Sequence, residues 1–159
     1  MPDRLQFRDA MARVGTSVHI VTTDGKAGVA GITASAVTSV SDDPPTMLIC
    51  VNRSSHSAPR FFANGVFCIN TLAADDQALA DDFAGRTGLH LDARFQRGSW
   101  VREVSGAPVL TSAIAIFECR IIELRDIATH HVIVGDVLAV RYRKEVAGLG
   151  YHDRRYLNF

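Results

Sequence analysis

The sequence predicts a mainly β fold, in which an antiparallel sheet closes fully or partly into a barrel and carries short flanking helices. Three observations lead to this prediction. Segments rich in β-branched residues dominate the chain, they do not alternate with long helical segments, and two of them are long enough to bend around a barrel. A doubly wound parallel sheet would need alternating strands and helices, so this alternative is disfavoured.

The first part of the chain is predicted to hold one helix and three strands. Phe7, Met11 and Val14 recur at helical spacing between charged residues, which indicates a short amphipathic helix. The strands are expected at Ser17–Thr23, Val29–Val40 and Thr46–Val51. An Asp24-Gly25 turn separates the first two, and the 42–45 segment, Asp-Asp-Pro-Pro, ends the second because proline cannot continue a strand ladder.

The remainder brings the expected total to about six strands and two or three short helices. Further strands are expected at Val66–Leu72, Ile114–Ile127 and His131–Arg143. Ala58–Ala63 is expected to form one or two helical turns, and Asp75–Phe83 a helix with acidic residues at its N-terminus. Gly85–Gly98 shows no clear period and is expected to be an irregular surface loop, while the tail from Gly148 to Phe159 is aromatic and basic.

Length and composition predict one globular domain over residues 1–159. Apolar residues make up 47% and charged residues 21%, and the formal net charge is zero. The chain therefore has no basic excess that would indicate a nucleic-acid partner. No apolar stretch approaches the roughly 20 residues that span a bilayer, and the N-terminal residues do not resemble a signal peptide.

Cysteine usage predicts a reducing compartment. Cys50, Cys68 and Cys119 are odd in number, widely spaced and set in apolar segments, so we expect reduced residues of the core. Together with the absence of a membrane or export signal, this predicts a cytoplasmic protein.

Familiar catalytic motifs are absent. The chain has no Gly-x-Gly-x-x-Gly, no phosphate-binding loop, no Gly-x-Ser-x-Gly and no His-Glu-x-x-His. His130 and His131 are adjacent and would project to opposite faces of a strand, so no metal site is expected there.

Five segments nevertheless carry residues suited to binding, and each has a simpler structural interpretation. The small residues at 31–41 would let a planar ligand approach the backbone, or would form the polar face of a strand. The 50–57 segment, Cys-Val-Asn-Arg-Ser-Ser-His-Ser, could bind phosphate or simply cap the next helix. Arg86, after Gly85, could bind phosphate or remain in solvent, and His130 could contact a ligand or be structural. The 150–156 segment could stack on a flat ligand or pack as a C-terminal strand.

The order of these segments resembles the short-chain flavin reductase family. The resemblance begins with Phe-Arg-Asp-Ala-Met at 7–11 and Val-His-Ile-Val-Thr-Thr at 18–23. It continues through Gly-Ile-Thr-Ala-Ser-Ala-Val at 31–37, Cys-Val-Asn-Arg at 50–53 and Phe-Ala-Gly at 83–85. It covers about residues 5–157. Within the family, the chain is most similar to the reductase components of two-component monooxygenases, including 4-hydroxyphenylacetate 3-monooxygenase reductase and the flavin reductase of pyrimidine degradation.

The resemblance implies a split β-barrel that forms homodimers, reduces FMN or FAD with NADH or NADPH, and supplies reduced flavin to a partner monooxygenase. It implies that His130 places the nicotinamide, although the family's Gly-Asp-His triplet reads Ala128-Thr129-His130 here. The flavin-binding residues it implies are Thr33, Ala34, Ser35, Ala36, Val37, Ser39, Cys50, Val51, Asn52, Ser54, Ser55, His56, Phe83 and Arg86, to which the aromatic tail adds Tyr151.

Two alternatives remain open at this point. One is a non-catalytic flavin-binding or electron-transfer module. The other is an oxidase of the related split-barrel class that retains FMN. The choices between FMN and FAD, and between NADH and NADPH, are also open.

Overall fold

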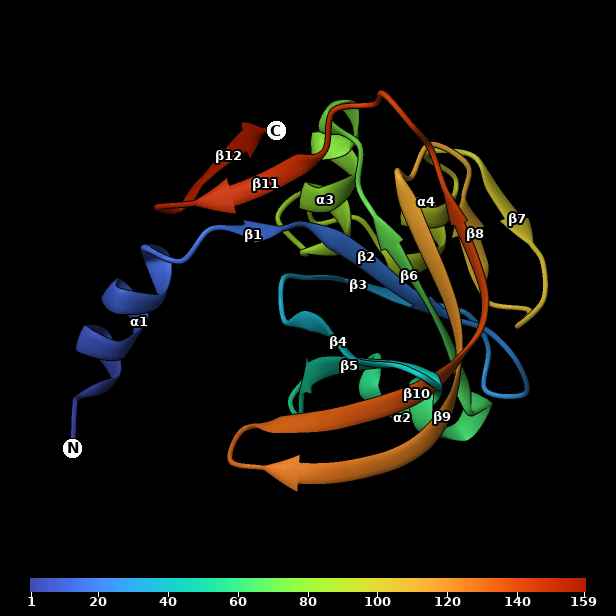
Figure 1. Ribbon diagram of the computed structural model, residues 1–159, viewed down its shortest axis with the longest axis horizontal. Helices are drawn as coiled ribbons and strands as arrows, with labels where there is room; N and C mark the ends of the chain where they lie inside the picture. The colour runs from blue at the N-terminus through green and yellow to red at the C-terminus, as the bar shows by residue number, and fades with distance from the viewer.

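The computed structural model of the protein describes residues 1–159. Its main element is a curved antiparallel sheet with the spatial strand order β3-β2-β6-β9-β10-β5-β4 (Figure 1). The strands of this sheet are β2 (His19–Thr23), β3 (Ala30–Ala34), β4 (Val37–Asp42), β5 (Pro45–Asn52), β6 (Val66–Thr71), β9 (Ala115–Ile127) and β10 (His130–Tyr142). The mainly β prediction is confirmed.

The sheet is curved but not closed. Its two edge strands, β3 and β4, follow each other in the chain, yet no ladder joins them. The sequence predicted a barrel that closes fully or partly, and the structure shows a partly closed one. The architecture fits the split-barrel class.

The single strand expected at Val29–Val40 is wrong, because the chain forms β3 and β4 there, at opposite edges of the sheet. Ser35 and Ala36 connect them, and the backbone N–H of Val37 donates to the carbonyl of Ser35 at 2.9 Å. Both sides of this break are rich in small and β-branched residues, so the pattern that predicted one strand gave no sign of the two-residue interruption.

The helices are short and lie around the sheet. They are α1 (Arg4–Ala12), α2 (Ala58–Asn64), the 3₁₀ turn η1 (Ala74–Asp76), α3 (Gln77–Phe83) and α4 (Leu91–Phe95). No helix is long and apolar enough to cross a membrane. The N-terminal helix α1 projects away from the rest of the molecule (Figure 1) and buries no residue, so its predicted apolar side has no partner within the chain.

Two smaller sheets complete the fold. One joins β1 (Thr16–Ser17), β11 (Leu149–His152) and β12 (Arg155–Asn158), and the other pairs β7 (Trp100–Arg102) with β8 (Pro108–Leu110). The short strands β7 and β8 were not expected. The prediction of an irregular Gly85–Gly98 loop is wrong in part, because α4 lies inside it. These elements are only three to five residues long, too short for periodicity to reveal.

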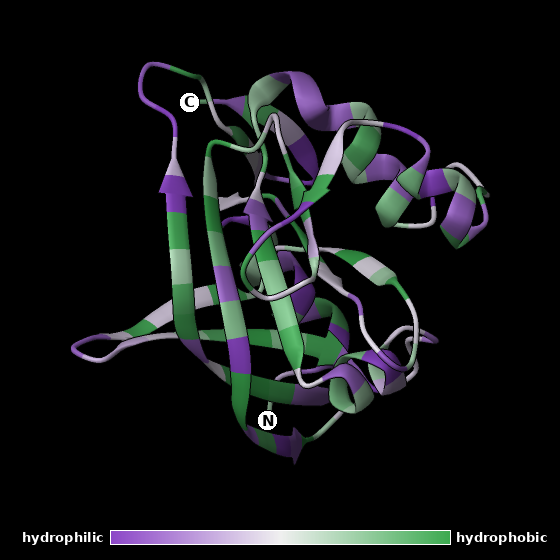
Figure 2. Cartoon of the chain, turned by 90° about the vertical axis from the view of Figure 1, so that its right-hand side faces the viewer, coloured by the Kyte–Doolittle hydropathy of each residue, from purple (hydrophilic) through white to green (hydrophobic).

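Two apolar clusters cover the two faces of the sheet. Alternate residues of one strand belong to different clusters: Ile20 packs with Phe83 and Leu110, whereas Val21 packs with Phe61 and Phe67. This follows from the two-residue period of a strand. Figure 2 shows the hydrophobic residues concentrated along these strands.

All three cysteines are free; Cys68 and Cys119 are buried as expected, but Cys50 is only half-buried.

Gly135 provides a direct test of this packing. A Cβ atom there would lie 2.7 Å from the ring of Phe67, which is fully buried, and 3.0 Å from Cβ of Cys119. We expect Gly135→Ala to lower the free energy of unfolding by about 1–3 kcal/mol, since a packed core has no room for an added methyl group. Urea denaturation would measure this change. Gly15→Ala is the control, because the nearest atom to its Cβ is 4.0 Å away, and an equal loss there would contradict the account.

Candidate functional site

A large open cavity lies where the ends of several elements meet. Its volume is about 940 Å³, within the range that small-molecule and cofactor sites occupy. Side chains from β3, β5, α2, α3, α4 and β10 line it together with the connecting segments. The lining residues are Ile32, Thr33, Ala34, Ser35, Ala36, Cys50, Asn52, Ser54, Ser55, His56, Ser57, Arg60, Phe83, Ala84, Gly85, Gly88, Leu89, His90, Leu91, Asp92, Arg94 and His130.

Small residues at the end of β3 form one wall of the cavity. Ala34, Ser35 and Ala36 have short side chains that leave the backbone accessible to a flat ligand. The close approach of α3 to this strand depends on Gly31, where a Cβ would lie only 2.8 Å from the ring of Phe83. The hydroxyl of Thr33 donates to the carbonyl of Ala80 at 2.6 Å, which ties β3 to α3.

The neighbouring ends of β5 and β10 form a second wall. His130 lies opposite Asn52 in the antiparallel register, and Cys50 lies two residues before Asn52, so all three side chains face the cavity. Nδ1 of His130 is 2.9 Å from the hydroxyl oxygen of Thr129. This contact engages one ring nitrogen and leaves Nε2 for a ligand. Burial raises the pKa of Cys50, which keeps this residue a neutral thiol.

His131 and Val51 face the opposite side of the same strands. The ring of His131 meets Phe62 edge-on with 4.6 Å between centroids, and its Nδ1 is 2.5 Å from a carboxylate oxygen of Asp126. Val51 is 1% exposed and belongs to the core. His130 and His131 therefore project to opposite faces of β10, as the alternation of side chains along a strand predicts.

A loop rich in hydroxyl groups follows β5. The side-chain oxygen of Asn52 accepts hydrogen bonds from the backbone N–H of Ser54 at 2.9 Å and from its hydroxyl at 2.8 Å. The carbonyl of Asn52 accepts from the backbone N–H of Ser55 at 2.9 Å. These bonds shape a turn whose hydroxyl groups line the cavity, and they leave the amide nitrogen of Asn52 as a further donor.

The charged side chains of the cavity favour an anionic ligand. Arg60 and Arg94 line it, together with His56 and His90, whereas Asp92 is its only acidic residue. Each arginine also bonds a backbone carbonyl: Nη1 of Arg60 donates to Val29 at 2.7 Å, and Nε of Arg94 donates to Leu89 at 2.9 Å. One bond of this kind orients a guanidinium group and leaves its remaining N–H groups for a phosphate or carboxylate.

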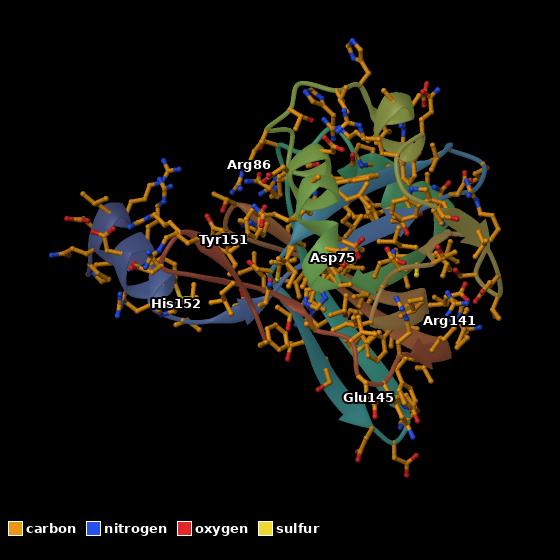
Figure 3. The ribbon with its side chains drawn as sticks, turned by 90° about the horizontal axis from the view of Figure 1, so that it is seen from above. Asp75, Arg86, Arg141, Glu145, Tyr151 and His152 are labelled. Carbon is orange, nitrogen blue, oxygen red and sulfur yellow. The ribbon has the colours of Figure 1, made fainter.

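A second, smaller pocket of about 170 Å³ adjoins the large cavity and shares Thr33, Ala34, Ser35 and Ala84 with it. Arg86 and Tyr151 line this smaller pocket, and Figure 3 shows them close together. Arg86 pairs with Asp81 at 3.0 Å and lies over the ring of Tyr151, 5.9 Å from its centroid.

The hydroxyl of Tyr156 completes the smaller pocket. It donates to Asp81 at 2.8 Å and accepts from Arg86 at 3.2 Å. Burial, followed by the hydrogen bond to Asp81, raises the pKa of Tyr156 to about 12, so this side chain stays a neutral phenol.

Most residues expected at the site lie together in the large cavity: Thr33, Ala34, Ser35, Ala36, Cys50, Asn52, Ser54, Ser55, His56, Phe83 and His130. Arg86 and Tyr151 lie in the smaller pocket. Val37, Ser39 and Val51 line neither. Val51 alternates on β5 with the cavity residues Cys50 and Asn52 and therefore points into the core, and Val37, the first residue of β4, packs against the same apolar cluster. Ser39 is exposed on β4, beside an irregularity in the ladder with β5.

Two parts of the cavity lining were not predicted from the sequence. Arg60 lies on α2, shortly after the hydroxyl-rich loop. A positive charge on the helix predicted next to that loop could have indicated that Arg60 belongs to the site. The wall formed by Gly88, Leu89, His90, Leu91, Asp92 and Arg94 gave no such signal, because its place over the cavity depends on contacts between residues far apart in the sequence.

The donors and the shape of the cavity fit a flavin mononucleotide. The small residues of β3 provide a flat wall for a ring system, and the hydroxyl and guanidinium groups of Ser54, Ser55 and Arg60 provide donors for a phosphate. His130 lies on a different wall from β3, where it can contact a second ligand.

Comparisons with known proteins agree with this fit. The FMN reductase (NADH) RutF of Variovorax paradoxus strain S110 is 48% identical over 153 residues, which cover 96% of this chain and 84% of that protein. BorF, the flavin reductase component of a bacterial two-component tryptophan halogenase, superposes with a TM-score of 0.90 at 31% identity, over 99% of this chain and 98% of BorF. The NADH:FAD oxidoreductase SgcE6 of Streptomyces globisporus C-1027, solved with NAD and FAD fragments, also gives 0.90 at 32% identity, over 99% of this chain and 93% of SgcE6.

The family model described as "Flavin reductase like domain" matches residues 11–159. This match includes every element from the end of α1 to β12. The chain therefore belongs to the flavin reductase family.

Proposed function

We propose that the protein is an NADH-dependent FMN reductase that supplies reduced flavin to a partner monooxygenase. The observation that carries this proposal is the single cavity that joins the small-residue wall of β3, the hydroxyl-rich loop after β5 and His130. The relative named FMN reductase (NADH) supports the choice of FMN and NADH.

The residues of β3 and of the loop after β5 bind the flavin in this proposal. Backbone groups at Ala34–Ala36 can bond the polar edge of the ring system, because the side chains there are short. Ser54, Ser55 and Arg60 hold the phosphate. Phe83, at the end of α3, covers an apolar part of the ligand. When bound, the flavin supplies the hydride acceptor, so the protein itself needs no nucleophile.

His130 places the nicotinamide ring of NADH in this proposal. Its Nδ1 contact with Thr129 fixes the imidazole, and Nε2 can donate to or accept from the carboxamide group of the nicotinamide. Fixing two rings in one geometry accelerates hydride transfer by removing much of the entropic cost of their encounter. The open form of the cavity suits a reductase that releases its flavin after reduction.

The partner is proposed to be a flavin-dependent monooxygenase component. BorF serves as the flavin reductase component of a two-component enzyme and is similar over almost the whole chain, which supports this proposal. A cytoplasmic location is also proposed, and the three free cysteines support it because thiols persist in reducing compartments.

A steady-state assay tests the proposed function. We expect NADH consumption by the protein to depend on added FMN, and FMN to separate from the protein during desalting. The competing electron-transfer module and the FMN-retaining oxidase predict the opposite pattern. In both cases flavin would remain bound after desalting, and added FMN would not stimulate NADH consumption.

We further propose that the protein acts as a homodimer. Exposed apolar side chains form two groups on β9 and β10: Ile122, Leu124 and Ile127 lie toward the turn that joins the strands, and Leu138, Val140 and Tyr142 lie at the other end of β10. Such groups on a sheet are suited to burial against a symmetric partner. Sedimentation should give a dimer at micromolar concentration, and Val140→Glu should shift it toward monomer while Val101→Glu on β7 should not. A wild-type monomer with full activity would contradict the proposal.

A further inference from the structure

The segment between α3 and β7 forms a wall of the cavity but buries little of itself. Its residues Gly88–Asp92 and Arg94 line the cavity. No residue from Ala84 to Ser99 is buried. Segments with so few buried contacts open at low free-energy cost, so the few contacts that hold this wall decide its position.

Asp82 makes two of those contacts. It lies in the last turn of α3, and its side chain is 0% exposed. One carboxylate oxygen accepts from the hydroxyl of Thr87 at 2.7 Å, and Nη1 of Arg97 lies 3.1 and 3.3 Å from the two oxygens. The two partners therefore flank the cavity wall, one at each end.

The charge of Asp82 makes these contacts matter. A buried carboxylate is costly unless it is paired and hydrogen-bonded, and here both partners come from the same segment. The carboxylate is thus satisfied only while Thr87 and Arg97 stay beside α3. Arg97 is further fixed because its carbonyl accepts from Nε1 of Trp100 at 2.7 Å.

Other contacts shape the wall itself. Phe95 packs against Phe83 and Trp100, with ring centroids 4.9 and 5.1 Å away. The hydrogen bond from Nε of Arg94 to the carbonyl of Leu89 holds the residues between Leu89 and Arg94 in place. The aromatic contacts anchor the far end of α4, whereas Asp82 anchors the ends of the whole segment.

We propose that Asp82 is a positioning residue that holds the 88–94 segment over the ligand cavity, and so sets the affinity for the flavin, without itself contacting the ligand. Asp82 does not line the cavity, so its effect acts through the segment. This inference rests on the proposed function, since it takes FMN as the ligand.

Three substitutions test the inference through the affinity for FMN. Asp82→Asn removes the charge and places an amide donor near the guanidinium of Arg97, Arg97→Gln removes the partner, and Arg97→Lys keeps the positive charge. We expect the first two to raise the Kd for FMN about tenfold, the scale of one charge-assisted hydrogen bond. Arg97→Lys should stay close to the wild type. At saturating FMN, kcat should change less than twofold.

Asp76→Asn is the matched control. Asp76 is also a buried carboxylate at the start of α3, and it accepts from the N–H of Ala73 at 3.1 Å and the hydroxyl of Ser112 at 2.8 Å. Neither Asp76 nor these partners line the cavity. Its loss should lower stability but leave the Kd for FMN unchanged.

Hydrogen exchange gives a readout specific to the segment. In Arg97→Gln, amides 88–96 should exchange faster than in the wild type, with the β-sheet unchanged. Arg97 is half-exposed, so this variant remains informative even if Asp82→Asn does not fold. If Arg97→Gln and any folded Asp82→Asn bind FMN like the wild type, the inference is overturned. If the wild type itself fails to bind FMN, the proposed function fails instead.

Discussion

His130→Ala is expected to raise the KM for NADH about fivefold to tenfold, which is the cost of losing one hydrogen bond to the substrate. Flavin affinity should change little, because His130 lies on a different wall from the small residues of β3, which are proposed to bind the flavin ring. Since hydride transfer needs no proton relay, we expect kcat to change less than KM. Steady-state kinetics with varied NADH, at saturating FMN, would measure both constants.

His131→Ala is the control for His130→Ala. His131 is the next residue on β10, but it packs on Phe62 and bonds Asp126 on the other side of the strand. Its loss should lower stability without changing the KM for NADH. If His131→Ala impaired NADH use and His130→Ala did not, the assignment of His130 would be wrong.

Arg60→Gln is expected to raise the Kd for FMN by about tenfold to a hundredfold. A hydrogen bond to a charged group contributes roughly 1.5–3 kcal/mol, and Arg60 is the cation on the helix that follows Ser54 and Ser55. Riboflavin lacks the phosphate, so its Kd should change less than twofold. Fluorescence titration with the two ligands would separate a phosphate contact from general damage to the cavity.

Arg86→Gln provides the comparison for Arg60. The sequence indicated that Arg86 could bind phosphate, but the guanidinium already pairs with Asp81 and lies in the smaller pocket. We therefore expect a weaker loss of FMN affinity than for Arg60→Gln. If the FMN-specific loss were larger for Arg86→Gln, the phosphate would belong to Arg86.

The long strands and their order along the chain could be predicted because each one carries its own pattern. β5, β6, β9 and β10 lie within a few residues of the expected bounds, since β-branched and apolar residues mark them locally. The break at Ser35 and Ala36 could not be predicted, because the two edge strands separate only when the whole sheet curves.

The site shows the same division between local and tertiary information. Strand alternation could have excluded Val51, since its neighbours Cys50 and Asn52 on β5 face the cavity. No local pattern could place the 88–94 wall. Its position depends on Asp82, which is five residues from Thr87 and fifteen from Arg97, and no periodicity links these residues.

Anaerobic mixing of the purified protein with FMN and NADH tests the central claim most directly. The flavin absorption in the visible range should bleach, and a molar excess of FMN over protein should be reduced completely, because each turnover releases reduced flavin. Bleaching no faster than in the absence of protein, with FMN and FAD and with NADH and NADPH, would contradict the account.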